Sequence, residues 1–150
     1  MAHTFTNLQT HVIFSTKDRV PSIQPQWKTD LLAYMGGIIR ELEGKAVTIN
    51  GTSDHVHLLV WMPPALSIAE TLRVLKTNSS RWVNRELGRK PSFAWQIGYG
   101  AFSVSHSNVP TVVRYIRAQE KHHRRVSFQE EFAAFLKRND IRYDERYIWE

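Results

Sequence analysis

Two histidines separated by a single residue have the clearest chemical potential in this sequence. His55 and His57 lie in the run Asp-His-Val-His-Leu-Leu-Val at residues 54–60, whose apolar, β-branched composition predicts a buried strand. A strand places residues i and i+2 on one face, roughly 6.5–7 Å apart along the chain, so the two imidazoles project together and can share a metal ion. Burying them without partners is unfavourable. The alternative explanation is a packed, hydrogen-bonded pair without a metal.

A tyrosine and a glutamine four residues apart form a second candidate group. Residues 114–119 read Arg-Tyr-Ile-Arg-Ala-Gln, and a helix there places Tyr115 and Gln119 on one face, about 6 Å apart along the axis. His122 lies near the same face. If this helix crosses the face that carries His55 and His57, Gln119 offers a carbonyl oxygen as a third metal ligand, and Tyr115 reaches a group bound to the metal. Taken alone, such a pair is also common on solvated helix faces.

A tyrosine hydroxyl beside a metal ion suits attack on a phosphodiester. The hydroxyl is a weak nucleophile with a pKa of about 10, and it becomes effective where a metal polarises the electrophile and stabilises the developing charge. The anionic oxygens of a phosphodiester bind a divalent ion directly. Mixed nitrogen and oxygen ligands fit Mn²⁺ or Mg²⁺ better than a structural zinc ion, which usually has four firm protein ligands.

The pattern of apolar residues predicts one domain over residues 1–150 that can position these groups. The chain is 42% hydrophobic and 23% charged, which supports a real core. We expect strand 7–15, helix 25–43, strands 45–51 and 54–62, a helix from the capping box of Ser67 and Glu70 to Gly88, a glycine-interrupted strand pair or a bulged strand at 93–104, and helices at 108–123 and about 127–138. This is the βαββαβ order of an α+β, ferredoxin-like antiparallel sheet, with helices on one face plus C-terminal helices that carry the tyrosine.

Composition excludes several classes of protein. The chain has no cysteine, so a disulfide-stapled secreted domain and a thiolate zinc site are ruled out. It has neither the residue order of a signal peptide nor an apolar run of membrane length, and we expect a cytoplasmic protein that uses no organic cofactor. For His3, His11 and His106 we expect surface or structural roles.

The balance of charge is basic and points to nucleic acid as one possible partner. Lys and Arg number 20 against 14 Asp and Glu, a formal net charge of +6, and 11% of residues are aromatic. A solvated positive face is equally compatible with these values. The basic run at 122–125 fits either a DNA contact or an interaction with a helix dipole. Candidate phosphate contacts elsewhere are Lys17, Arg19, Lys76, Arg81 and Arg85.

The candidate residues belong to a longer series of motifs. In chain order these are the His-Val-His triplet at 55–57 with the LLVWMPP after it, KTNSSRW at 76–82, WQ at 95–96, GY at 98–99, FSV at 102–104, and Tyr-Ile-x-x-Gln at 115–119. With these motifs in this order over nearly the whole chain, the sequence resembles the small single-tyrosine HUH transposases of hairpin-ended insertion sequences, a group with palindrome-associated relatives. The YIRAQ form of the tyrosine motif fits the insertion-sequence branch better.

The resemblance implies a transposase that cleaves and rejoins single-stranded DNA at hairpin-marked element ends. It assigns Tyr115 as the nucleophile, which becomes joined to the 5′ phosphate and frees a 3′ hydroxyl, and it assigns His55, His57 and Gln119 as ligands of Mg²⁺ or Mn²⁺. The 3′ hydroxyl of another strand then reverses the attack, so no external energy is needed. The resemblance also implies a homodimer with merged sheets, in which the tyrosine helix serves its own subunit or the partner.

Two other functions are compatible with parts of the sequence. A non-catalytic, domesticated nucleic-acid-binding domain on the same scaffold suits the basic charge and the aromatic residues equally well. A metal hydrolase with water as its nucleophile is a more distant alternative, because the chain has no His-Glu-x-x-His motif or carboxylate cluster. Covalent attachment of Tyr115 to DNA separates the transposase from both.

Overall fold

A computed structural model describes residues 3–88, 92–123 and 125–150 of the chain. Within these residues, β1 (Gln9–Ser15), β2 (Lys45–Gly51), β3 (His55–Trp61) and β4 (Gly100–Val104) form one antiparallel sheet in the order β2-β3-β1-β4. The helices are α1 (Pro25–Glu41), α2 (Ile68–Leu87), α3 (Val109–Arg117), α4 (Gln119–His122) and α5 (Phe128–Arg138), with short 3₁₀ turns η1 (Lys17–Arg19) and η2 (His106–Asn108). This order confirms the expected ferredoxin-like βαββαβ arrangement with additional C-terminal helices.

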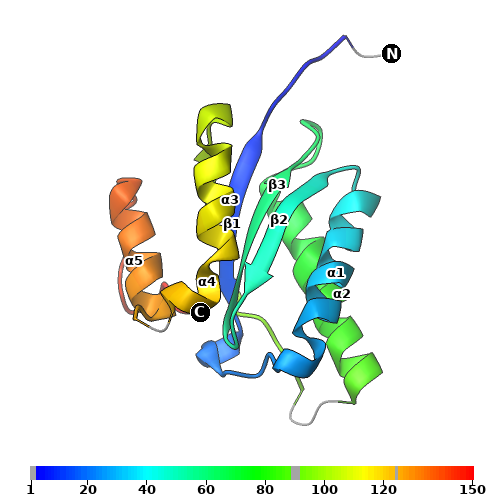
Figure 1. The fold of residues 1–150 in the computed structure, drawn as a ribbon, viewed down its shortest axis with the longest axis vertical. Coiled ribbons are helices and arrows are strands. Elements are labelled where there is room, and N and C mark those ends of the chain that lie inside the picture. Colours follow the sequence, from blue (N-terminus) through cyan, green and yellow to red (C-terminus); the bar gives the residue numbers. More distant parts are fainter. Residues whose placement is uncertain (1–2, 89–91, 124) are drawn as a thin grey trace.

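The sheet separates two helical layers (Figure 1). Helices α1 and α2 lie together on one side of the sheet, and α3, α4 and α5 lie on the other. Because successive side chains of a strand point to opposite faces, β3 serves both layers. Val56, Leu58 and Val60 belong to the core under α1 and α2, whereas His55 and His57 contact residues of the C-terminal layer.

The layer of α1 and α2 encloses the larger apolar core. Val12 and Phe14 of β1 join the β3 residues there. The helices contribute side chains at three- and four-residue spacing, the stripe that the sequence predicts. Their buried members are Trp27, Leu31, Met35, Ile38, Ile39, Leu72, Leu75 and Val83. The opposite face has a smaller apolar cluster, which docks α5 on the sheet and consists of Ile13, Phe102, Phe128, Phe132 and Leu136.

Two helices, one in each layer, begin with the same capping arrangement. Ser67 Oγ accepts a hydrogen bond from the backbone N–H of Glu70 at 3.1 Å at the start of α2, and Ser127 Oγ accepts one from Glu130 at 3.2 Å at the start of α5. Gly88, with φ of 54°, ends α2 in the left-handed region. Although α2 has 20 residues, none of the described helices is both long and apolar enough to cross a membrane.

The hairpin between β2 and β3 fixes the register of the two histidines. Asn50 pairs with His57 and Gly51 with Val56. A Cβ at Gly51 would lie 2.7 Å from the carbonyl oxygen of His55, so only glycine allows this close approach. At the other end of β2 the register shifts between Ala46 and Thr48, where β2 holds one extra residue as a bulge.

The predicted strand or strand pair at 93–104 is shorter in the structure. Only 100–104 joins the sheet as β4, and Trp95 makes a single bridge to Thr16. The backbone of the preceding segment bonds partly to the loop after β1, where the Ala94 C=O accepts from the Lys17 N–H, and partly to a side chain. The Asn84 amide bonds both the N–H and the C=O of Phe93. The rings of Phe93 and Trp95 are buried in the larger core. This anchoring replaces a continuous strand.

The predicted helix at 108–123 is interrupted at Ala118, which separates α3 from α4. Asn50 on β2 explains the interruption, because its Nδ2 donates to the carbonyl oxygens of Ile116 at 2.9 Å and Arg117 at 3.2 Å. These are carbonyls near the C-terminus of α3 that need partners once the helix ends. Tyr115 therefore lies near the end of a short helix, and Gln119 begins the next one.

Candidate active site

His55 and His57 project from β3 into the layer formed by α3, α4 and α5. Both side chains are fully buried, and their ring centroids lie 5.3 Å apart. On the neighbouring strand β1, Ser15 pairs with His55 and Ile13 with His57. The strand thus places both imidazoles on one face, in the manner that their spacing predicts.

The outer ring nitrogen of each histidine is held by a neighbouring residue. Nδ1 of His55 lies 2.6 Å from Asp54 Oδ1 and 2.9 Å from Thr52 Oγ1. Because an ionised carboxylate only accepts hydrogen bonds, Nδ1 of His55 donates to it, which leaves the lone pair on Nε2. Burial opposes ionisation of Asp54, but the hydrogen bond with His55 outweighs it and lowers the pKa of the carboxyl. Nδ1 of His57 lies 2.9 Å from Nε2 of His11, a buried residue of β1.

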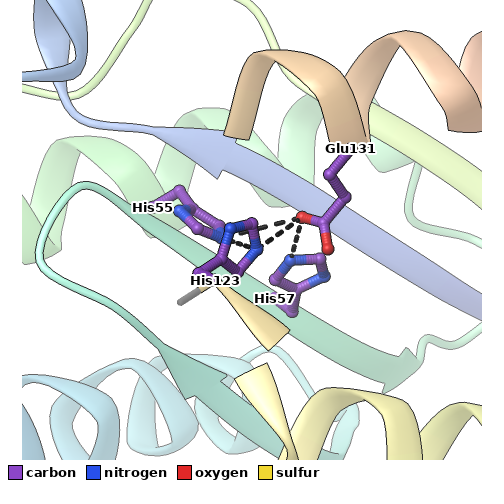
Figure 2. A group of neighbouring side chains, drawn as sticks. All are labelled: His55, His57, His123 and Glu131. Carbon is purple, nitrogen blue, oxygen red and sulfur yellow. Dashed lines mark hydrogen bonds and ion pairs between the residues drawn. The ribbon is translucent and has the colours of Figure 1, made fainter. Parts of the chain in front are cut away.

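The inner nitrogens converge on a carboxylate from α5 and on a third imidazole (Figure 2). Oε1 of Glu131 lies 2.8 Å from Nε2 of His57, 3.1 Å from Nε2 of His123 and 3.6 Å from Nε2 of His55. The Nε2 atoms of His55 and His123 are 2.9 Å apart. One donor atom from each of the four residues lies within 4.8 Å of the other three. We refer to His55, His57, His123 and Glu131 as the histidine–carboxylate cluster.

Burial and mutual contacts set the protonation of this cluster. Burial favours the neutral form of Glu131, but hydrogen bonds from His123 and His57 outweigh burial and hold the pKa of the carboxyl well below its usual range. Burial lowers the pKa of His57 to about 4. Burial also disfavours the charged form of His123, yet its hydrogen bond to Glu131 raises the pKa overall. Near pH 7 the cluster therefore combines an ionised carboxylate with a neutral His57, both of which can bind a cation.

Tyr115 lies on α3 with its hydroxyl at the edge of the cluster. The hydroxyl donates a hydrogen bond to Oε2 of Glu131 and lies 3.4 Å from Nε2 of His122. The ring meets that of His57 edge-on, with 5.8 Å between centroids. Burial, reinforced by Glu131, raises the pKa of the Tyr115 hydroxyl, so it is protonated at neutral pH. The tyrosine and the paired histidines thus meet within one chain.

Gln119, the third metal ligand expected from the sequence, is fully buried at the start of α4. Its Nε2 donates to the backbone carbonyl of Tyr115 at 3.1 Å. Its Oε1 is buried and has no hydrogen-bond partner among the described residues. Within the same residues, no hydrogen bond joins this side chain to His55 or His57. The amide therefore lies beside the tyrosine, while the inner histidine nitrogens contact the carboxylate from α5.

The five basic residues predicted to contact DNA are divided between the two sides of the sheet. Lys17 and Arg19 lie in η1, directly after the end of β1 that pairs with the start of β3. Lys76, Arg81 and Arg85 lie on α2, across the sheet from the cluster. Lys76 Nζ donates to two backbone carbonyls of the segment before β4, both at 2.8 Å, and burial lowers its pKa to about 8. The structure therefore brings only the first two toward the histidine end of the sheet.

Sequence reasoning missed three residues of this site. It predicted only a helix at about 127–138, and it interpreted 122–125 as either a DNA contact or an interaction with a helix dipole, so Glu131 and His123 were not assigned to the site. It gave His11 a surface or structural role. Arg124 of that basic run lies outside the described residues. One signal was available: Glu131 falls three residues after Phe128 in the apolar stripe of its helix, where a carboxylate needs buried partners.

The donor set of the cluster fits a divalent metal ion. The Nδ1 atoms of His55 and His57 are hydrogen-bonded to Asp54 and His11, and such outer hydrogen bonds orient imidazole ligands in protein metal sites. The Nε2 atoms of His55 and His57 face the buried Glu131 carboxylate. A metal held there would lie beside the Tyr115 hydroxyl, because that hydroxyl contacts the other oxygen of the same carboxylate. The arrangement suits attack of the hydroxyl on an anionic electrophile such as a phosphodiester.

Comparisons with known proteins identify relatives of one kind. The sequence profile of the family described as "Transposase IS200 like" matches residues 4–119. The transposases for insertion sequence element IS200 from Salmonella typhimurium strain LT2 and from Salmonella typhi are each 30% identical over 129 residues, which cover 79% of this chain and 81% of the relative. The profile match ends before His123 and Glu131.

Two solved structures share the fold. A candidate transposase from Deinococcus radiodurans R1 has a TM-score of 0.64 and 22% sequence identity, over 79% of this chain and 95% of its own. A REP-associated tyrosine transposase bound to a REP hairpin has a TM-score of 0.61 and 13% identity, over 82% of this chain and 72% of its own. Both support the α+β architecture described above.

Proposed function

The chain belongs to the IS200-like transposase family, and from this premise we propose that it cleaves and rejoins single-stranded DNA at hairpin-marked ends through a covalent bond between Tyr115 and a 5′ phosphate. One observation carries the proposal. The Tyr115 hydroxyl lies against a buried carboxylate that also contacts the paired histidines, all within one chain. The structural relative bound to a REP hairpin supports a DNA hairpin as the substrate class.

The proposed reaction is a transesterification at phosphorus. The Tyr115 oxygen forms a bond to phosphorus while the bond from phosphorus to the 3′ oxygen breaks. The phenol loses its proton, and the departing 3′ oxygen gains one to become a hydroxyl, so atoms and charge balance. The phosphotyrosine diester retains the energy of the broken bond, and the 3′ hydroxyl of another strand can therefore reverse the attack.

The protein's own residues hold the nucleophile ready before DNA binds. Oε2 of Glu131 accepts the hydrogen bond of Tyr115, and this contact together with burial keeps the hydroxyl neutral. The edge-on packing against His57 fixes the ring. A divalent ion held at His55 and His57 would supply positive charge to the scissile phosphate in the transition state. The family resemblance adds Gln119 as a further ligand.

Binding of the DNA backbone is proposed for the basic residues closest to this site. Lys17 and Arg19 in η1 extend from the histidine end of the sheet, where they can neutralise phosphates that flank the cleaved one. Lys76, Arg81 and Arg85 on α2 could contact only a DNA segment that passes over the opposite layer. Substitution of Lys17 and Arg19 should therefore weaken binding more than substitution of the α2 residues.

A homodimer is also proposed, as the resemblance implies. The sheet ends at β2 and β4, and the outer edge of each has no partner strand in the described chain, so either edge can pair with a second copy. Light scattering on the purified protein should give about 35 kDa, twice the 17.5 kDa chain. A mass of one chain at all concentrations would contradict the dimer.

The test is covalent capture of DNA. Wild-type protein is incubated with labelled, hairpin-ended single-stranded DNA and Mn²⁺ or Mg²⁺, and protein–DNA adducts are resolved on a denaturing gel. We expect an adduct that chelator prevents and that Tyr115→Phe lacks. Tyr147→Phe, which alters an exposed tyrosine, is the matched control and should form the adduct normally.

Two outcomes would redirect the assignment. An adduct that persists in Tyr115→Phe would remove this residue as the nucleophile. Hairpin binding that resists chelator and His57→Ala, with no adduct under any metal, would favour the non-catalytic DNA-binding domain.

A further inference from the structure

We propose that His123 and Glu131 complete the metal site begun by His55 and His57, which makes it a centre of three imidazoles and one carboxylate that selects a transition-metal ion over Mg²⁺. This rests on the proposed function for the identity of the site, but metal binding can be measured without DNA. Both added residues follow residue 119, where the family profile ends.

The first support is the convergence of the donor atoms. Oε1 of Glu131 lies within 2.8–3.6 Å of three Nε2 atoms, and two of these nitrogens lie 2.9 Å from each other. Such short nitrogen–nitrogen and nitrogen–oxygen separations place four ligand atoms on one small centre (Figure 2). The side chains of His55, His57 and Glu131 are at most 2% exposed, and that of His123 is 9% exposed. Four polar side chains concentrated in this way are unfavourable unless their charges and lone pairs are matched.

The second support is the orientation of the ligands from outside. Asp54 holds Nδ1 of His55, and His11 holds Nδ1 of His57. Asp54 fixes His55 in the tautomer whose lone pair is on Nε2. When no metal is bound, Nε2 of His57 donates to Glu131, and it would give up this proton to bind a metal, with Nδ1 then donating to His11. His11 is itself buried and meets Phe135 edge-on at 5.2 Å, so it has a defined place behind His57.

The third support is the position of the competing ligand. Gln119, which the resemblance assigns to the metal, directs its amide nitrogen to the backbone of Tyr115, and its buried Oε1 has no hydrogen-bond partner among the described residues. Glu131 instead has its Oε1 among the histidines and its Oε2 at the tyrosine hydroxyl. A charged carboxylate is also a stronger ligand for a divalent ion than a neutral amide. Glu131 is therefore the oxygen ligand that already contacts the histidine nitrogens, whereas among the described residues no hydrogen bond joins Gln119 to them.

The ligand set determines the metal. Mg²⁺ prefers oxygen ligands and retains several waters, whereas imidazole nitrogens suit later divalent ions such as Fe²⁺, Co²⁺ and Zn²⁺. Three imidazoles and one carboxylate leave little room for a hydrated Mg²⁺. We expect Co²⁺ to bind at least about 100-fold more tightly than Mg²⁺.

The experiment titrates metal-free, full-length protein with Co²⁺ and follows the visible absorption of the bound ion. Glu131→Gln keeps the size of the side chain and removes its charge, and it should bind Co²⁺ at least about 100-fold more weakly. Loss of a residue that only hydrogen-bonds a metal ligand already lowers metal affinity by about 10–100-fold. Glu130→Gln, its exposed neighbour, is the control and should bind normally. Gln119→Leu should bind within about threefold of wild type. Normal affinity in Glu131→Gln together with loss in Gln119→Leu would overturn the assignment.

X-ray absorption of the Co²⁺ protein provides a readout of the ligands themselves. Wild type should show three imidazoles, and His123→Ala should show two. Two imidazoles in wild type would refute the role of His123. If circular dichroism shows that Glu131→Gln does not fold, Glu131→Asp replaces it. Asp holds its carboxylate one methylene farther from the histidines, so the Co²⁺ spectrum should change. An unchanged spectrum would contradict the proposal.

The proposal and the proposed function fail in different ways. Tyr115→Phe should retain the Co²⁺ spectrum and lose the DNA adduct. A wild-type protein that has the three-imidazole centre but forms no adduct would refute the tyrosine chemistry alone. A protein that forms the adduct while Glu131→Gln binds metal normally would refute the cluster as the metal site alone.

Discussion

Along β3, neighbouring residues meet two different environments. Val56 and Leu58 point into an apolar core that needs only shape and volume, whereas His55 and His57 point into a cluster in which each ring nitrogen has a named partner. Burial of an aliphatic side chain stabilises the fold by about 1.5–3 kcal/mol, while burial of a polar one is unfavourable unless it is satisfied. The face under α1 and α2 therefore stabilises the fold through apolar volume, whereas the stability of the His55 and His57 face also depends on keeping its buried polar groups paired.

The comparison predicts its largest effect for His57→Ala. Removal of this imidazole should abolish the DNA adduct and weaken metal binding by more than about 100-fold, because the inner nitrogen meets Glu131 at 2.8 Å. Isothermal titration with Co²⁺ and the adduct gel measure these effects. His3→Ala, at an exposed position, is the control. Retained adduct formation in His57→Ala would show that the His55 and His57 face of the sheet is not required for the reaction.

The adjacent substitution, Leu58→Ala, should have the opposite profile. Leu58 is fully buried in the larger core, and its truncation should lower the free energy of unfolding by about 2–5 kcal/mol. Urea unfolding gives this value. Metal affinity per folded molecule should stay within about twofold of wild type. A large loss of metal affinity in folded Leu58→Ala would mean that the two faces are coupled.

Acid should destabilise the metal-free protein through the polar face. Burial lowers the pKa of His57 to about 4 and that of His11 to about 3, so between those values and about 6.5 the unfolded chain binds more protons than the folded one. Stability therefore falls as the pH falls from 7 to 5, by roughly 1–2 kcal/mol for each of these histidines. The pKa of His123 is raised in the folded protein, so protonation of His123 stabilises the fold as the pH falls and partly offsets this loss.

Urea unfolding at pH 7, 6 and 5 measures this dependence. His11→Gln removes one of the two responsible groups and should make the dependence shallower. An equally steep fall in His11→Gln would exclude His11 as a contributor.

A smaller effect is expected for the outer partner of His55. Asp54→Asn keeps the size of the side chain but removes the charge that orients Nδ1 of His55 at 2.6 Å. Metal affinity should fall by about 10–100-fold, while Asp30→Asn on the exposed side of α1 should have no effect. Co²⁺ titration distinguishes them, and an unaltered affinity in Asp54→Asn would show that the Asp54 charge is not needed to orient His55.

The smallest expected effect compares the two capping serines. Ser67→Ala and Ser127→Ala should each lower the free energy of unfolding by about 1 kcal/mol, because each removes a hydrogen bond at a helix N-terminus. Only Ser127→Ala should also weaken metal binding, since α5 carries Glu131. Equal metal affinities in the two variants would indicate that α5 stays docked without its cap.

The difference between the faces also explains what could be predicted from sequence. The first three strands, α1 and α2 follow from local signals, namely period-two alternation, apolar stripes and the Ser67 capping box. The placement of both imidazoles on one face follows from the same alternation. These features need no knowledge of distant residues, and the structure confirms them.

The rest of the site depends on contacts between distant parts of the chain. Glu131 lies 74 residues from His57 and meets it only because α5 docks on the open face of the sheet. The break at Ala118 depends on Asn50, which belongs to β2. No local sequence pattern predicts either contact. The sequence therefore predicted a continuous helix at 108–123, and Glu131 was not assigned to the site.

The bulge in β2 has a consequence for how sequences of this kind can change length. The extra residue between Ala46 and Thr48 is absorbed at the far end of an edge strand, where later pairs are unaffected. Insertion or deletion of a single residue within β3 would instead move histidine side chains to the face that packs against α1 and α2, and would place aliphatic side chains on the face of the cluster. We therefore expect related genes to tolerate insertions and deletions near residue 47 and to lack them within β3 (His55–Trp61).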